Sequence, residues 1–571
     1  MNKKVIRWIT TAVVTVSLLS GCQGKAATEK SGADSSQSST VDALAQESQT
    51  DSESSEAAES VSTAESTSVS GDSAEEKEYI SVADDTDTLV VLQSADPRGL
   101  DPAFADDMES SRIISQIYEG LLTFNQESMG LMPGLAKSWE ISADKLTYTF
   151  HLRTGVKFQD GTDFNAEAVK YNVDRQTSKA VSGMTYADFV YGNVKECRVV
   201  DASTVEMELV TPVNSFLSDL AMNLSAPIVS PAACEANGGN LSNNPVGTGP
   251  YKFVSWDKGN QIILEANENY RAQAAETQKL VFQTVSDLTE RVNMLTAGAA
   301  DLTEGLDPSV LDQLDTGAVE ILSQDGMNVN YMAYNTKKLT DPKLRKALSQ
   351  AVDTEKLTES LYQTYATPAT SVVPAVVSDY GKAVRQTSYD AKAAKKVLDE
   401  NGVTFVHIIT YTNAQPYNTA TGQLLAEAVQ SYFDKVGIFA SIDAYDWKDY
   451  EQKLSEGDYD ICFYGWIGDN GDAGNFLTQF AESDPTMNVA GYENEEYNTL
   501  LASAASAGVR SESRELYQKA EQLLADADAV LPISHQQVLC GYNKNLTELL
   551  MNPAGDINYS RIIKEAPSIL P

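Results

Sequence analysis

Residues 23–87 contain almost no aromatic side chains and are dominated by Ser, Ala, Glu, Thr and Asp. A segment of this composition cannot bury enough apolar surface to offset its loss of conformational entropy, so we expect it to remain unfolded. It carries about 16 acidic and about 3 basic residues, and repulsion between like charges extends such a chain. We therefore expect the folded part of the protein to lie in residues 88–571.

The N-terminal residues have the layout of a secretion signal. Three basic residues precede an apolar stretch over residues 8–19, which is shorter than the roughly 20 residues that a membrane-spanning helix needs. The stretch ends in Leu-Ser-Gly-Cys, and Cys22 is placed to receive a diacylglycerol after cleavage and to become the new N-terminus. We predict a signal peptide over 1–21, then a lipidated Cys22 with an unfolded stalk over 22–87. The alternative is an ordinary signal peptide with a chance cysteine.

The lipid anchor would hold the mature protein at the outer face of the cytoplasmic membrane. An extended stalk of about 65 residues suits a thick cell wall, so we favour a Gram-positive cell. In a Gram-negative cell the protein would lie on the periplasmic side of the membrane. No second apolar run of 18 residues follows, and we expect no membrane-spanning helix in the body.

The remaining body of about 485 residues is too long for one hydrophobic core, because cores stop growing at roughly 250–300 residues. At least two domains are expected. Strand patterns and amphipathic helix patterns alternate along it, which favours an α/β fold. The predicted strands are 88–92, 147–152, 204–210 and 459–463, and the predicted helices are 343–352, 389–399, 419–436 and 510–527.

The formal net charge of −39 is spread over the body as well as the predicted stalk. This charge argues against nucleic acid or anionic lipid headgroups as partners, because both carry negative phosphates. It mildly favours cationic or zwitterionic ligands. A charge that only keeps an exported protein soluble explains the composition equally well.

The sequence contains no recognisable catalytic or metal-binding motif. The histidines His151, His407 and His535 lie far apart, and there is no nucleophile elbow, P-loop or dinucleotide-binding glycine pattern. Residues 469–475 fail the calcium-loop pattern, because Gly471 takes a ligand position. We therefore expect no catalytic residues, no cofactor and no metal site in a protein that is not an enzyme. An exported chaperone, or a hydrolase with a dispersed triad, is the alternative of another class.

Six short stretches of the body form a specific set when they are taken together. They are GLAKSW at 134–139, YTFHLR at 148–153, VKFQDG at 156–161, FNA at 164–166, NPVGTGPY at 244–251 and DPKLRKAL at 341–348. This set resembles the peptide- and nickel-binding branch of the bacterial extracellular solute-binding proteins, family 5, which feed ABC importers. The resemblance covers essentially the whole body.

The resemblance implies an α/β, two-lobed, periplasmic-binding-protein-like fold of type II, in the large cluster with an extra subdomain in lobe I. The ligand cleft would lie between the lobes. We place the two chain crossings near 327–335 and 533–540, so that lobe I comprises 88–330 with 536–571 and lobe II comprises 331–535. A ligand that contacts both lobes shifts the population toward the closed form, which a permease then recognises. We expect a monomer.

Four cysteines remain in the body after Cys22, and none has the C-x-x-C spacing of a zinc site or a thioredoxin-like pair. They are Cys197, Cys234, Cys462 and Cys540. Export permits disulfides. Cys197 with Cys234 is the first pairing to test, because both should lie in the same lobe. The other pairings and four reduced thiols are the alternatives.

The motif GWIGDNGD at 465–472 is where the chemistry and the resemblance agree. An extended peptide offers its backbone to a strand edge, and its α-ammonium needs a carboxylate once water is excluded. In the family, the aspartate that follows Gly-Trp and two further residues holds the ligand's amino terminus, and Asp469 matches that position. Gly465, Trp466 and Ile467 would pair with the peptide backbone. A solvated turn after a strand is the alternative interpretation.

The form of this motif is closer to the dipeptide-binding members than to the oligopeptide-binding ones. Dipeptide binders place an arginine before a Pro-Tyr-Asn run to hold the ligand's carboxylate, whereas here Gln415 precedes the run that contains Tyr417. A neutral amide cannot neutralise a carboxylate or form the charged fork. Either another cation takes this role, with Arg98 in the loop 94–101 as a candidate, or the site admits longer peptides. Tyr186 is a further candidate lining residue.

The sequence thus predicts a lipoprotein that captures small peptides, from di- to oligopeptides, and delivers them to an ABC permease in the membrane. The predicted peptide-binding residues are Asp469, Trp466, Gly465, Ile467, Gln415, Tyr417, Tyr186 and Arg98. The same fold with another cargo, such as a metal chelate, haem, an oligosaccharide or a signalling peptide, is the main alternative.

Overall fold

A computed structural model describes five segments of the chain, and none of their helices is long and apolar enough to cross a membrane. The described segments are 79–178, 182–377, 387–481, 485–507 and 510–566. The predicted signal peptide, Cys22 and nearly all of the predicted stalk lie outside them.

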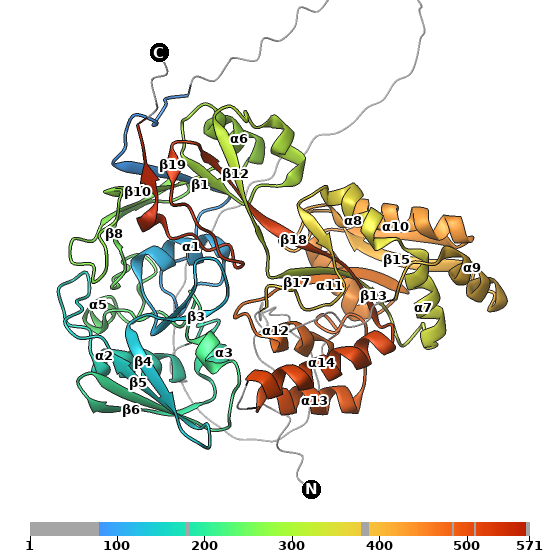
Figure 1. Ribbon diagram of the computed structural model, residues 1–571, viewed down its shortest axis with the longest axis horizontal. Helices are drawn as coiled ribbons and strands as arrows, with labels where there is room; N and C mark the ends of the chain where they lie inside the picture. Colours follow the sequence, from blue (N-terminus) through green and yellow to red (C-terminus); the bar gives the residue numbers. More distant parts are fainter. Residues whose placement is uncertain (1–78, 179–181, 378–386, 482–484, 508–509, 567–571) are drawn as a thin grey trace, which may run out of the picture. The chain divides into compact units, whose positions relative to one another are not determined.

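One large mixed sheet runs through the described body in the order β16-β15-β17-β13-β18-β11-β1-β10-β9-β8, and β12 and β14 also pair with β18 (Figure 1). Its strands are β1 (Thr88–Gln93), β8 (Tyr251–Asp257), β9 (Gln261–Ala266), β10 (Lys279–Thr284), β11 (Leu302–Glu304), β12 (Val319–Asp325), β13 (Asn328–Tyr334), β14 (Ala366–Pro368), β15 (Phe405–Tyr411), β16 (Phe439–Tyr445), β17 (Ile461–Ile467) and β18 (Val530–Asn543).

Smaller sheets complete the strands. A four-stranded antiparallel sheet has the order β4-β5-β7-β6, and β2 with β3 and β19 with β20 form two-stranded ribbons. Their bounds are β2 (Leu122–Phe124), β3 (Leu131–Pro133), β4 (Ala136–Ile141), β5 (Thr147–Leu152), β6 (Val194–Asp201), β7 (Thr204–Leu209), β19 (Leu546–Thr547) and β20 (Ile563–Lys564). Every second residue of β5 and β7 is buried, which is the expected pattern of a sheet with one face on a core.

Most helices begin at a side chain that caps their first turn. Asn165, Asp341 and Thr421, for example, accept hydrogen bonds from backbone N–H groups of α2, α7 and α10. The α-helices are α1 (Met108–Ile117), α2 (Ala166–Thr177), α3 (Ala187–Tyr191), α4 (Phe216–Asp219), α5 (Pro231–Ala236), α6 (Leu288–Thr296), α7 (Pro342–Ala351), α8 (Thr354–Tyr362), α9 (Ala391–Glu400), α10 (Gly422–Val436), α11 (Trp447–Glu456), α12 (Ala473–Leu477), α13 (Glu495–Ala505) and α14 (Arg510–Asp526). The 3₁₀ helices are η1 (Pro308–Gln313), η2 (Thr478–Ala481) and η3 (Tyr559–Arg561).

Each strand and helix predicted from the hydrophobic pattern is present. The predicted strands correspond to β1, β5, β7 and β17, and the predicted helices to α7, α9, α10 and α14. The main difference is at β17, which continues to Ile467 and so includes the Gly-Trp-Ile part of the motif. The α/β class is confirmed.

The four body cysteines are buried free thiols, which is one of the alternatives left open by the sequence, and the Cys197–Cys234 pairing that was the first to test is not formed. Cys197 lies on β6 and packs in the hydrophobic core that includes the four-stranded sheet, whereas Cys234 lies on α5 in the core shared by β1 and α1. The two sulfur atoms therefore belong to different cores. Burial raises the pKa of the Cys197 thiol to about 12, which keeps it protonated.

The strand β18 is 14 residues long and changes partners along its length. Its first part pairs with β13 and β14, and its later part pairs with β12 and β11 (Figure 1). The chain crosses between the two halves of the sheet at residues 326–327, between β12 and β13, and again along β18 near Gln536. We propose that the lobes divide at these crossings, with the predicted bounds 88–330 plus 536–571 and 331–535.

Asn328 joins the two crossings through its side-chain amide. Its Oδ1 accepts a hydrogen bond from the backbone N–H of Gln536 at 2.7 Å, and its Nδ2 donates to the Gln536 carbonyl at 2.8 Å. The side-chain amide thus forms with the Gln536 backbone the two hydrogen bonds that a residue of a neighbouring strand would form. A Cβ atom on Gly326 would come within 2.4 Å of Asn328 Nδ2, so the close approach needs glycine at that position.

Replacing Asn328 with alanine leaves the backbone N–H of Gln536 without this partner in a buried place, whereas the Gln536 C=O keeps a hydrogen bond from the Gly326 N–H at 3.1 Å. Because one unsatisfied buried group costs about 1–3 kcal/mol, we expect the free energy of unfolding to fall by about 1–3 kcal/mol. Urea unfolding followed by tryptophan fluorescence measures this change. The control is Asn260→Ala, which removes an exposed side chain bonded to Asp257 and should cost less than about 0.5 kcal/mol. Equal losses in both variants would contradict the role of Asn328.

Candidate functional site

The loop that follows β17 carries the predicted amino-group ligand. It leads into α12, which Asp472 caps by accepting a hydrogen bond from the Gly474 N–H at 2.8 Å. Gly471 has a φ of +68°, a left-handed conformation that favours glycine, and a Cβ there would lie 3.0 Å from Met129. The tight turn therefore holds Asp469 and Asp472 close together in space as well as in sequence.

Asp469 is a half-buried carboxyl held by two neutral side chains. Asn475 Nδ2 donates to its Oδ2 at 3.1 Å, and Asn475 Oδ1 accepts from the Asp469 backbone N–H at 3.2 Å and from Trp466 Nε1 at 2.8 Å. The Tyr186 hydroxyl donates a further hydrogen bond. Burial raises the pKa of Asp469 to about 6, although both hydrogen bonds oppose the shift. The carboxylate is thus only partly compensated by its neighbours.

Tyr186 is hydrogen-bonded to Asp469, and Arg98 is related to this pair through the charge of its partner Asp106. The negative charge of Asp469, burial and the charge of Asp106 all raise the pKa of the Tyr186 hydroxyl. Asp106 forms an ion pair with Arg98, with Oδ1 and Nη1 2.9 Å apart. The Arg98 side chain is 72% exposed, so this cation remains accessible to a ligand. The structure therefore brings together three predicted residues, Asp469, Tyr186 and Arg98.

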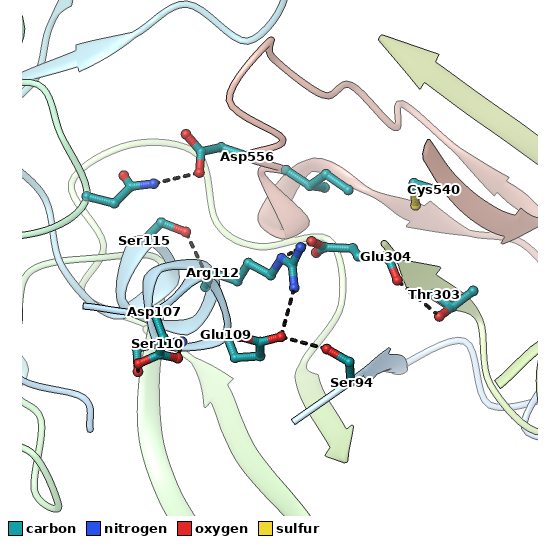
Figure 2. A network of polar contacts seen from close by, with 12 residues as sticks. Ser94, Asp107, Glu109, Ser110, Arg112, Ser115, Thr303, Glu304, Cys540 and Asp556 are labelled. Atoms are coloured by element: carbon teal, nitrogen blue, oxygen red, sulfur yellow. Dashed lines mark hydrogen bonds and ion pairs between the residues drawn. The ribbon is translucent and has the colours of Figure 1, made fainter. Parts of the chain in front are cut away.

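The loop that carries Arg98 is anchored to the N-terminal half of α1 by a network of polar contacts (Figure 2). Ser94 Oγ donates to Glu109 at 2.7 Å, and Arg112 lies between Glu109 and the buried Glu304 at the end of β11. Burial raises the pKa of Glu304 to about 7 against the attraction of Arg112. Sequence reasoning missed this network because its members are far apart in the chain and belong to no motif.

The residues Gly465, Trp466 and Ile467 have one paired and one open edge. They pair with β13 on one side, opposite Asn330, Val329 and Asn328. On the other side, β17 pairs with β15 only at Ile461 and Cys462. In the described part of the chain, the edge at 465–467 that faces away from β13 therefore has no strand partner, and it is open to an added extended segment.

Tyr417 and Gln415 occupy a turn beside the same strand. The Tyr417 ring packs directly over Gly465, where an added Cβ would lie 2.3 Å from its Cδ2 atom. Tyr417 is only 8% exposed, which makes it a core aromatic as much as a lining residue. Gln415 is half-buried, and its backbone is paired with that of Asn418. No hydrogen bond or ion pair between described residues joins Gln415 or Tyr417 to Asp469.

Asn214, just before α4, and Asp219, at the end of α4, form hydrogen bonds with the loop that follows β17. Asn214 Nδ2 donates to Asp472 Oδ2 at 2.7 Å. Asn470 Nδ2 donates to Asp219 Oδ1 at 2.6 Å, and Ser215 Oγ donates to Asp219 Oδ2 at 2.9 Å. Nothing in the sequence marked Asp219, because a carboxylate at the end of a short helix is commonplace. Asp472 also takes part in the local turn, because it caps α12.

Asp219 is only 3% exposed. Burial raises its pKa to about 8, the charges of Asp472 and Asp469 add to the shift, and the hydrogen bonds from Asn470 and Ser215 oppose it. A carboxyl with this pKa is mostly protonated at neutral pH.

The structure describes no group of three or more His, Cys, Asp or Glu side chains arranged to hold a metal ion in the segments given above.

The raised pKa of Asp219 predicts how stability depends on pH. Because the folded protein binds this proton more tightly than the unfolded chain, the contribution of Asp219 to stability is lost as pH rises from about 4 to about 8. We expect Asp219→Asn to flatten this dependence and to exceed the wild type by about 1–3 kcal/mol in free energy of unfolding at pH 8. Urea unfolding at pH 5, 6.5 and 8 measures the difference. The control is Asp163→Asn, at a side chain 72% exposed. A constant difference between wild type and Asp219→Asn across this range would contradict the assignment.

The comparisons with known proteins cover most of the chain. The family model "Bacterial extracellular solute-binding proteins, family 5 Middle" matches residues 130–488. Heme-binding protein A of Haemophilus influenzae is 31% identical over 503 residues, which cover 82% of this chain and 90% of that protein. The dipeptide-binding protein of Escherichia coli is 29% identical over 505 residues, which cover 83% of this chain and 94% of that protein.

Two solved structures also resemble this chain over most of its length. HbpA2 from Haemophilus parasuis superposes with a TM-score of 0.76 at 28% identity and covers 84% of this chain and 100% of its own. The ABC transporter-associated periplasmic binding protein DppA from Helicobacter pylori, in complex with the peptide STSA, superposes with a TM-score of 0.68 at 27% identity, over 84% and 98% of the two chains.

The fold and these similarities define a two-lobed solute-binding protein, a class of ABC-importer components and not of enzymes. The chain belongs to the bacterial extracellular solute-binding proteins, family 5. The predicted family and fold class are therefore confirmed.

Proposed function

We propose that this protein captures small peptides, from di- to oligopeptides, by their free amino group and delivers them to an ABC permease. The observation that carries the proposal is Asp469, a partly desolvated carboxylate whose side-chain partners in the described segments are the neutral Asn475 and Tyr186. It follows directly after a strand with an open edge at 465–467. A ligand ammonium would supply the missing positive charge, and the ligand backbone would pair with the open edge.

The names of the relatives support a peptide cargo. One is a dipeptide-binding protein, and the solved Helicobacter pylori structure holds a peptide. Haem is the second candidate, because the Haemophilus influenzae relative is a heme-binding protein. Haem has no ammonium group, so the two cargoes differ in what they would require of Asp469.

The proposal includes the way in which the protein is held at the membrane. Lipid on Cys22 would anchor a monomer to the outer face of the cytoplasmic membrane, with the stalk 22–87 as a spacer and the permease subunits as partners. The Leu-Ser-Gly-Cys run and the acidic, aromatic-poor composition of the stalk support this arrangement.

The amino-group requirement is tested by isothermal titration. The protein is produced from residue 23 onward, then unfolded and refolded to remove carried-over ligand, and titrated with di-, tri- and pentapeptides with free or acetylated amino ends. We expect only free peptides to bind, and we expect Asp469→Asn to weaken their binding by about 2–4 kcal/mol, because the ammonium loses its charged partner.

The matched control is Asp458→Asn, at a carboxylate 86% exposed in an ion pair with Lys338. This variant should bind peptides as the wild type does. Equal binding of acetylated peptides, or binding of haem with no peptide binding, would contradict the proposed function.

Gln415 tests where the ligand's carboxylate lies. If the carboxyl end of a dipeptide reaches Gln415, then Gln415→Arg supplies the charged fork and should improve dipeptide affinity about tenfold or more relative to pentapeptides. Gln415→Glu has a similar size and the opposite charge, and it should weaken dipeptide binding. Unchanged length preference in both variants, measured by the same titration, would place the carboxylate elsewhere, with the exposed Arg98 as the next cation to test.

A further inference from the structure

Four side chains join the loop after β17 to the segment of α4, and we call them the clasp: Asn214, Asp219, Asn470 and Asp472. The clasp consists of two amide-to-carboxylate hydrogen bonds that run in opposite directions. Asn214 donates to Asp472 at 2.7 Å, and Asn470 donates to Asp219 at 2.6 Å. Each side of the contact thus contributes one amide and one carboxyl. Asp219, Asn470 and Asp472 are at most 8% exposed, so the clasp is largely shielded from water.

Asn470 links the clasp to the proposed amino-group site at Asp469. Asn470 follows Asp469 directly, and its Oδ1 accepts the Asp472 backbone N–H at 2.9 Å while its Nδ2 reaches Asp219. Both ends of the Asn470 amide are therefore occupied, which fixes its orientation. A change in the hydrogen bonding of Asp219 reaches Asp469 through this one side chain and the tight turn that it holds.

The charged side chains with the largest effects on Asp219 are all negative. The titratable groups that interact with it include Asp469 and Asp472 from the loop, Tyr148 from β5 and Tyr517 from α14, all of them acidic. Among the described residues, the side chains with the largest effects on the pKa of Asp219 and of Asp469 are neutral or acidic, and none of them is basic. Oδ1 accepts from Asn470 and Oδ2 accepts from Ser215 Oγ, and both hydrogen bonds favour the ionised carboxylate. Burial beside the carboxyls of Asp469 and Asp472 favours the neutral form and outweighs them.

We propose that Asp219 is a positioning residue of the amino-group site and that a ligand ammonium binding at Asp469 expels a proton from Asp219 into the solvent. The O–H bond of the Asp219 carboxyl breaks, the proton passes to water or buffer, and the ligand ammonium keeps all its protons. The ammonium takes the place of the proton as the positive charge of the site. Asp219, now ionised, accepts the Asn470 hydrogen bond more strongly and holds the loop in place. This inference rests on the proposed function.

Proton release has a measurable consequence for affinity. When binding expels a proton, the dissociation constant falls as pH rises, by up to about tenfold for each pH unit and each proton. The effect ends above about pH 8, because a peptide's own amino group, with a pKa of about 7.7–8.0, then loses its charge. Affinity should therefore be greatest between about pH 7 and pH 8.

The test is a proton inventory by isothermal titration at pH 7.0. The wild type and Asp219→Asn, each produced from residue 23 onward, are titrated with the tightest free-amino peptide of the set above, in phosphate and in Tris. Any proton released enters the buffer, so the difference in heat between buffers counts protons. We expect the wild type to release about half a proton or more per peptide beyond Asp219→Asn. Protons from Asp469 and from the peptide appear equally in both proteins and cancel.

A second measurement is spectroscopic. A neutral carboxyl has its own infrared carbonyl band, and the difference spectrum between free and peptide-bound wild type at pH 7.5 should show the loss of that band. Because Glu304, with a pKa of about 7, is also partly neutral at this pH, the same spectrum is recorded for Asp219→Asn, and the part of the lost band that this variant lacks reports Asp219.

The outcomes separate the two proposals. Peptide binding with equal proton counts in wild type and Asp219→Asn, or with no loss of the neutral carboxyl band, would overturn this inference and leave the proposed function standing. If no free-amino peptide binds, the proposed function fails and this inference fails with it.

Discussion

The rest of the structure depends on β18, the strand that pairs with both halves of the large sheet and that the Asn328 side chain holds at Gln536. β17 pairs with β13, β13 with β18, and β18 with β11, which lies beside β1. One ladder of backbone hydrogen bonds thus connects the strand before Asp469 with the strand before the Arg98 loop. Because strands in a ladder keep a set register, the two loops are placed by the sheet and not by their own sequences. The Asn328 amide continues the ladder where the chain passes from one half of the sheet to the other.

The candidate site on this frame contains buried carboxyls whose hydrogen-bond partners, among the described residues, are neutral. Asp469 and Asp219 are surrounded by amides and hydroxyls, and burial raises the pKa of both. Desolvated carboxyls of this kind lower the stability of the empty protein, and under the proposed function a cationic ligand would supply the missing interaction. The same physical feature therefore makes the empty site unfavourable and the occupied site selective.

The family sets the fold and the transport class, but not the cargo. Relatives of comparable identity carry names that specify haem and dipeptides. A shared fold accommodates different ligands because a few side chains in the site decide what binds. In this chain the positions that we propose as deciding are Asp469 for a positive group and Gln415 or Arg98 for a negative one. The exposed ion pair of Arg98 with Asp106 leaves that cation available at little energetic cost.

The sequence by itself determined the local structure and the family. Alternation over β5 and β7, helical periodicity over α7 and α10, and the turn residues of 465–472 all act over short distances, so periodicity and motif were enough to predict them. Only the tertiary structure decided which distant residues meet. The pairs Asp219 with Asn470 and Arg112 with Glu304 depend on the order of strands in the sheet, and separate cores rule out the Cys197–Cys234 bond. No local pattern encodes such contacts, because the elements that form them are far apart in the chain.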